Sequence, residues 1–129
     1  LYSWTGDGLF DVDDAKALWN DGKPAAVVQF GCYNTYFVDP TVNSLSHRFL
    51  LSGNNGAALV SGATVLPGGY SEYQLGMRMM PLISTPGKPI GLAIQEAKED
   101  LARRSPGLLD VLLGYIILGD PTSVVVQSQ

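Results

Sequence analysis

The sequence has only one cysteine, Cys32, and one histidine, His47, among its 129 residues. A single cysteine excludes an internal disulfide and a zinc site built from several cysteines. Charged residues make up 16% of the chain and its formal net charge is −4, with the eight Lys and Arg scattered rather than clustered. This excludes the basic face that nucleic acids and anionic membranes require.

Long apolar runs and targeting signals are also missing. No run approaches the roughly 18 uninterrupted apolar residues of a membrane span. There is no initiator Met and no basic segment ahead of an apolar one, so no signal peptide is visible. The chain opens on an aromatic and glycine-rich stretch, "LYSWTGDGLF". We expect the true start of the protein to lie upstream of Leu1, at a processing site or at an arbitrary boundary.

What is present is the composition of one globular domain. Hydrophobic residues make up 46% of the chain, and its length is sufficient for a substantial core. Charged residues fall below the usual quarter. This indicates extensive burial, or a segment that packs against another part of a protein.

The order of elements predicts an α/β fold. Residues 90–105 are the clearest helix, since five apolar residues form one stripe: Ile90, Ala93, Ile94, Ala97 and Leu101. The pattern further predicts a loop over 1–10, helices over 11–20, 45–52, 72–83 and 106–119, buried strands over 25–30 and 56–63, and a short strand or extended tail over 123–126.

Alternation of helices with fully apolar strands indicates a parallel sheet covered on both faces. Two or three strands are few for such a sheet, which typically has about five or six. We therefore expect the missing strands in an upstream segment. An exposed apolar sheet edge should follow, through which the chain associates with a partner segment or with itself.

Cys32 directly follows the buried run "AAVVQF" and Gly31. In open parallel sheets, reactive groups gather at the carboxyl ends of strands, and a glycine there allows a sharp turn. Cys32 is therefore a candidate nucleophile. The alternative is that it is a small buried hydrophobic residue.

A thiol nucleophile needs a base to form thiolate near neutral pH. His47 lies fifteen residues on, in a predicted helix whose Leu45 and Phe49 face the core, which favours a surface or capping histidine. A base would then come from outside this chain. The acids at 11–14 suit a helix start better than a calcium loop, and the glycines after 62 match no phosphate-binding motif. The sequence predicts no metal and no cofactor.

Four segments, in order, carry a family resemblance: "FGCYNTYF", "DPTVNSLSHRFLLSG", "GAALVSGAT" and "YIILGDPT". From about Asp11 to Val126 the chain resembles the C-terminal half of the gingipain family of cysteine peptidases, in the caspase-like clan. The resemblance implies a three-layer α/β/α sandwich with a mostly parallel sheet, incomplete in this chain. Residues 1–129 would be the C-terminal part of a single peptidase domain.

The resemblance also implies a chemistry. Cys32 would attack the scissile carbonyl of a polypeptide and form an acyl-enzyme. Its backbone N–H and that of a Gly after the catalytic His would make the oxyanion hole. That His would lie on a strand upstream, so the isolated chain should be inactive. Gly31, Cys32, Ser61 and Thr64 are oxyanion or cleft candidates. The family resemblance implies a secreted or cell-surface protein.

The chain departs from the family at two points. Thr35 stands where the family often has Gly, although Phe37 matches, and the His-Gly pair is absent. Two other interpretations therefore stay open. One is a caspase-like domain without proteolysis, acting in interaction or secretion. The other is an unrelated α/β binding domain with Cys32 in its core.

Overall fold

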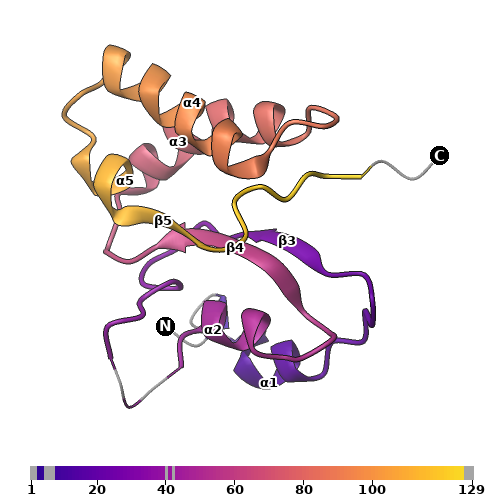
Figure 1. Cartoon of the computed structure of the whole chain (residues 1–129). Helices are drawn as coiled ribbons and strands as arrows, with labels where there is room; N and C mark the ends of the chain where they lie inside the picture. Colours follow the sequence, from indigo (N-terminus) through magenta and orange to yellow (C-terminus); the bar gives the residue numbers. More distant parts are fainter. Residues whose placement is uncertain (1–2, 5–7, 40, 42, 127–129) are drawn as a thin grey trace.

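The computed structural model describes residues 3–4, 8–39, 41 and 43–126. A three-stranded sheet lies between two helical layers (Figure 1). Helices α1 (Val12–Lys16) and α2 (Leu45–Leu50) cover one face, and α3 (Gly69–Ile83), α4 (Ile90–Arg104) and α5 (Leu109–Gly114) cover the other. This is the three-layer α/β/α arrangement expected from the sequence.

The sheet has the order β3 (Ala25–Val28), β4 (Ala57–Ala63), β5 (Tyr115–Gly119). Strands β3 and β4 are parallel, with Val28 opposite Ser61, while β4 and β5 are antiparallel. Adjacent residues Leu59 and Val60 of β4 are both fully buried but belong to different core clusters. The central strand is thus covered on both faces, as its continuous apolar sequence indicates.

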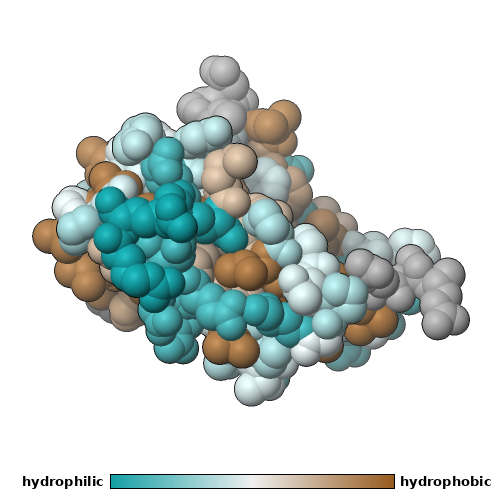
Figure 2. All heavy atoms as spheres, turned by 90° about the horizontal axis from the view of Figure 1, so that it is seen from above, coloured by the Kyte–Doolittle hydropathy of each residue, from teal (hydrophilic) through white to brown (hydrophobic). Residues whose placement is uncertain are grey.

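The larger core lies between the sheet and the α3–α4–α5 layer. The predicted stripe of α4 is confirmed, because its five apolar residues are all at most 3% exposed. Seen from the side of this layer, a broad hydrophilic band crosses the surface and hydrophobic atoms gather at the left, over α5 (Figure 2). Helices α3 and α4 bury an apolar stripe, although Met77 and Leu92 on them also remain exposed, as Leu109 and Leu113 do on α5.

The predicted helix over 106–119 is wrong in its second half. The helix ends at Gly114 and the chain continues as strand β5. A Cβ on Gly114 would lie 2.4 Å from Val65 Cγ2, so only glycine allows the backbone to pass here. Tyr115, Ile116 and Ile117 follow, and aromatic and β-branched residues favour an extended chain.

Smaller corrections concern the two ends of the chain. The predicted N-terminal loop contains a two-residue antiparallel pair, β1 (Ser3–Trp4) with β2 (Phe10–Asp11). Helix α1 is shorter than predicted. Residues 123–126 form an extended tail with one isolated bridge, Pro89 to Val124, and no strand. No described helix combines the length and apolar character needed to cross a bilayer.

Candidate active site

Cys32 lies just beyond the carboxyl end of β3 and is exposed to solvent. The parallel pairing continues to Gln29, whose N–H donates to Ser61 O at 2.8 Å. Gly31 then adopts a φ of +152°, which L side chains rarely reach, and the chain turns. The interpretation of Cys32 as a buried core residue is wrong.

Three consecutive backbone N–H groups differ in what they contact. The N–H of Gly31 donates to Glu72 Oε1 at 2.7 Å, and that of Tyr33 donates to Val65 O at 3.0 Å. Within the described residues, the N–H of Cys32 between them has no hydrogen-bond partner. The flanking bonds hold the backbone while the Cys32 amide remains available as a donor beside the thiol.

Glu72 reaches this turn from the first turn of α3. Burial raises the pKa of its carboxyl group, the hydrogen bond from Gly31 opposes that rise, and the nearby charge of Asp110 adds to it. The ring of Phe30 packs against the same helix, since a Cβ on Gly76 would lie 3.0 Å from the ring. Helix α3 therefore fixes both residues that precede Cys32.

Gln29 anchors the strand end to three other elements. Its side-chain oxygen accepts a hydrogen bond from Trp4 Nε1 at 3.0 Å, and its Nε2 donates to Ser46 Oγ at 2.7 Å. Its backbone carbonyl accepts a hydrogen bond from the hydroxyl of Tyr115. Burial raises the pKa of Tyr115, which keeps the phenol protonated as a donor.

The loop after Cys32 turns back under the sheet. Tyr33 has a positive φ of 56°, while Asn34 and Thr35 are buried. The hydroxyl of Thr35 lies 2.9 Å from Ser46 Oγ, and a Cβ on Gly62 would come within 2.3 Å of that hydroxyl. Thr35, which stands where the resemblance expects Gly, thus points into the protein and leaves the surface around the thiol unchanged.

The other residues predicted from the sequence lie near this point, but their polar groups are engaged. Ser61 is fully buried and its hydroxyl donates to Ile116 O at 3.1 Å. The hydroxyl of Thr64 donates to Gly114 O at 3.0 Å. Together with the bond from Gly31 to Glu72, this leaves the Cys32 amide as the free donor among these candidates.

His47 acts as part of a helix cap. The backbone N–H of Ser44 donates to His47 Nδ1 at 3.2 Å, at the start of α2. Asp11 similarly caps α1 in a reciprocal capping box with Asp14, as expected for an acidic helix start. No group of three or more His, Cys, Asp or Glu side chains in the described ranges could hold a metal ion.

A small groove of about 330 Å³ begins at Phe30, two residues before Cys32. It lies against α3 and is lined by Phe30, Gly69, Glu72, Tyr73, Gly76 and Met77. Sequence reasoning missed Glu72, Gln29 and Tyr115 as parts of this site. An acid in the first turn of the helix after β4 was the one available signal, and it also fits ordinary interaction with the helix dipole.

Comparisons with known proteins agree with this architecture. The model of peptidase family C25 matches residues 1–126. A complex of the pro- and mature domains of Porphyromonas gingivalis RgpB superposes with a TM-score of 0.78 at 16% identity. A crystal structure of the Arg-specific cysteine proteinase gingipain R superposes with a TM-score of 0.79 at 12% identity. No curated protein sequence matches the chain.

Both superpositions cover 96% of this chain but only 31% of the other, so the chain spans about a third of the length of these structures. At this identity they confirm the fold, the caspase-like sandwich of gingipains. The family model covers nearly the whole chain. The chain therefore belongs to peptidase family C25, the gingipain family of cysteine peptidases.

Proposed function

We propose that this chain supplies the nucleophile of a cysteine endopeptidase. The Sγ of Cys32 attacks the scissile carbonyl carbon, the amine leaves with a proton, and water hydrolyses the resulting acyl-enzyme. The observation that carries the proposal is an exposed thiol whose own backbone N–H is free to donate to the developing oxyanion.

The base is proposed to come from an upstream segment of the same protein. In the described structure, β3 pairs only with β4, and Ala25 and Ala26 on it are exposed. A further parallel strand on that edge would end beside Cys32, because carboxyl ends of parallel strands meet at one edge of the sheet. Residues 1–129 would then form the C-terminal part of one peptidase domain, secreted or on the cell surface.

Turnover of peptide substrates tests the proposal. In the full-length protein, Cys32→Ala should lower kcat/KM by about a thousandfold or more, since residual catalysis without the nucleophile is small. His47→Ala is the matched control and should leave turnover unchanged, because this histidine caps α2. The 129-residue chain alone should be inactive, and turnover by it that Cys32→Ala abolishes would contradict an external base.

The alternative is a caspase-like domain that does not cleave peptides. Alkylation of the full-length protein separates the two functions. A peptidase thiol should react with iodoacetamide faster than a free thiol at pH 7, because a neighbouring base raises the thiolate fraction. A rate no faster than that of free cysteine would favour an interaction or secretion role.

The free edge of β3 also predicts association. Unpaired N–H and C=O groups along an apolar strand recruit another strand. We expect this edge to pair with the upstream segment or, in its absence, with a second copy. Sedimentation that shows a stable monomer of the isolated chain would contradict self-association.

A further inference from the structure

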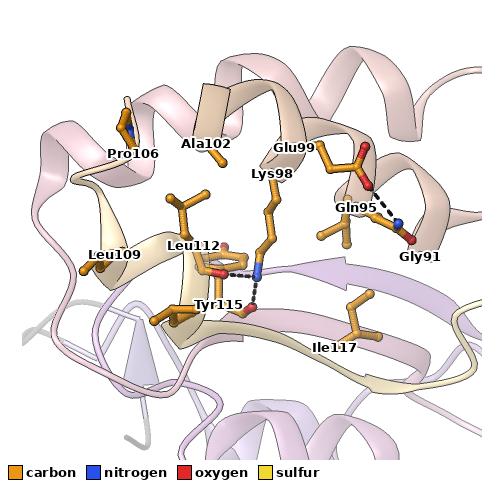
Figure 3. Close-up of a pocket in the computed structure, with 12 residues that line it drawn as sticks. Gly91, Gln95, Lys98, Glu99, Ala102, Pro106, Leu109, Leu112, Tyr115 and Ile117 are labelled. Carbon is orange, nitrogen blue, oxygen red and sulfur yellow. Dashed lines mark hydrogen bonds between the residues drawn. The ribbon is translucent and has the colours of Figure 1, made fainter. Parts of the chain in front are cut away.

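A second concave site lies in the other helical layer, between α4, α5 and β5 (Figure 3). Its volume is about 610 Å³, within the range of roughly 300–1,000 Å³ typical of small-molecule sites. Most of its lining is apolar and includes Ile94, Ala102, Pro106, Leu109, Leu112 and Ile117. Cys32 is not among the lining residues, and the link to its strand end is Tyr115, which also lines the cavity and whose hydroxyl donates to Gln29 O.

One cation lies inside this cavity. The Nζ of Lys98 donates to Leu112 O at 3.0 Å and to Tyr115 O at 2.5 Å. An ammonium group has three N–H donors, so one remains for a ligand. Lys98 takes part in no ion pair among the described residues.

Neighbouring charges do not neutralise Lys98. Lys88 in the same layer differs from Lys98, because its Nζ forms an ion pair with Glu96 at 2.5 Å. Glu99 also lines the cavity, but it accepts a hydrogen bond from Gln95 at 2.9 Å and points away from the Lys98 ammonium (Figure 3). Burial lowers the pKa of Lys98, and no acid among the described residues opposes that effect.

An anion would remove the cost of burying this charge, because a charge-assisted hydrogen bond is stronger in a partly apolar site than in water. The rest of the cavity suits a hydrocarbon. Leu109 and Leu113 on α5 are 57% and 75% exposed, so apolar surface lies open beside the ammonium. A chain lying between α4 and α5 would cover part of it.

We propose that this cavity binds a medium-chain aliphatic carboxylate, with its carboxylate on Lys98 Nζ and its hydrocarbon chain between α4 and α5. The site is separate from Cys32 and does not depend on the proposed peptidase function. Three features match this ligand: the third N–H donor of Lys98 Nζ, the lack of an ion pair to Lys98 within the described part of the chain, and the apolar lining.

Titration of the full chain with octanoate, followed by amide chemical shifts, tests the proposal. Octanoate should bind saturably and shift the amides of α4, α5 and β5, while 1-octanol of equal length should bind about tenfold more weakly. Lys98→Met should remove this difference, and Lys88→Met, outside the cavity, should leave it intact. Ala102→Phe fills the cavity without changing any charge and should weaken binding of both compounds.

Equal affinity for octanoate and octanol would overturn the proposal, as would shifts spread over the whole surface. Tighter binding of acetyl-leucyl-leucine than of octanoate would identify a peptide carboxyl terminus as the ligand and would also overturn it. Thermal unfolding of each variant keeps these results separate from loss of the fold. Unchanged octanoate affinity in folded Lys98→Met would count directly against a role for the ammonium.

Discussion

The two faces of the sheet are built differently. The face covered by α3, α4 and α5 has two helices of 15 residues each and a large, almost purely aliphatic core. The face covered by α1 and α2 has helices of five and six residues, an aromatic cluster and a buried polar network. In that cluster the rings of Trp4 and Phe10 lie 4.8 Å apart.

The two kinds of contact have different effects: one stabilises the fold, and the other positions the backbone around Cys32. Buried aliphatic contacts are not directional, and they contribute in proportion to the area removed from water. Hydrogen bonds fix distances and angles, and the network through Gln29, Ser46 and Thr35 runs directly beneath the turn that carries Cys32. The thicker layer therefore buries the larger aliphatic core, and the strand end is held by the polar network of the thinner side together with Glu72 of α3.

The largest effect should come from matched cavities in the two layers. Leu101 and Leu45 are both fully buried, one on each face. Leu101→Ala should lower the free energy of unfolding by about 4 kcal/mol and Leu45→Ala by about 2 kcal/mol, because the thinner layer can collapse further into the space. Urea unfolding measures both. Equal losses would mean that the two layers contribute alike.

A smaller loss is expected from the polar network. Gln29→Leu keeps the approximate shape but leaves the Trp4 indole N–H without its acceptor, at a cost of about 1.5 kcal/mol. Gln95→Leu, on the exposed side of α4, is the control and should change stability by less than about 0.5 kcal/mol. If both variants unfold at the same urea concentration as the parent, the network does not stabilise the strand end.

The half-buried carboxyl group of Glu72, which accepts the hydrogen bond from Gly31, should make the free energy of unfolding depend on pH. Its pKa is raised in the folded state, so its contribution to stability is full below the ordinary value of 4.5 and is lost as pH rises through the higher folded value. The parent should therefore lose stability relative to Glu72→Gln as pH increases. Unfolding free energies at several pH values measure this difference, and an opposite slope would contradict it.

The smallest effect on stability should come from Cys32 itself. Because the thiol is exposed, Cys32→Ser should change the free energy of unfolding by less than about 0.5 kcal/mol. The same substitution should abolish peptide turnover by the full-length protein. A loss above about 1 kcal/mol would show that the sulfur contributes to packing. Cys32 would then stabilise the fold as well as carry the proposed reaction.

Helices and strands could be predicted well only where one hydrophobic repeat dominated the sequence. The stripe of α4 identifies both the helix and its buried face, and β4 is evident as a short apolar run between glycines. The segment ending in β5 could not be divided, because apolar residues on every side suit a buried helix and a buried strand equally. Antiparallel pairing with β4 decides between them, and that pairing joins distant parts of the chain.

The candidate site shows the same limit. Cys32 could be placed from its position after β3, since strand ends follow from local pattern. The partners of its neighbours could not, because Glu72 is 41 residues from Gly31 and Tyr115 is 86 residues from Gln29. Each is an ordinary helix or strand residue in the sequence. Only the packing of the layers brings these side chains to the strand end.

The contact between Thr35 and Gly62 has a consequence for the evolution of this chain. A methyl group at position 62 would overlap the Thr35 hydroxyl at 2.3 Å, so each residue limits the size of the other. Thr35→Gly would remove this hydroxyl and leave Gln29 as the nearest neighbour of an alanine side chain at position 62, with its Cβ at 3.4 Å. The two positions should thus be coupled, and Gly62→Ala should be tolerated better together with Thr35→Gly than alone.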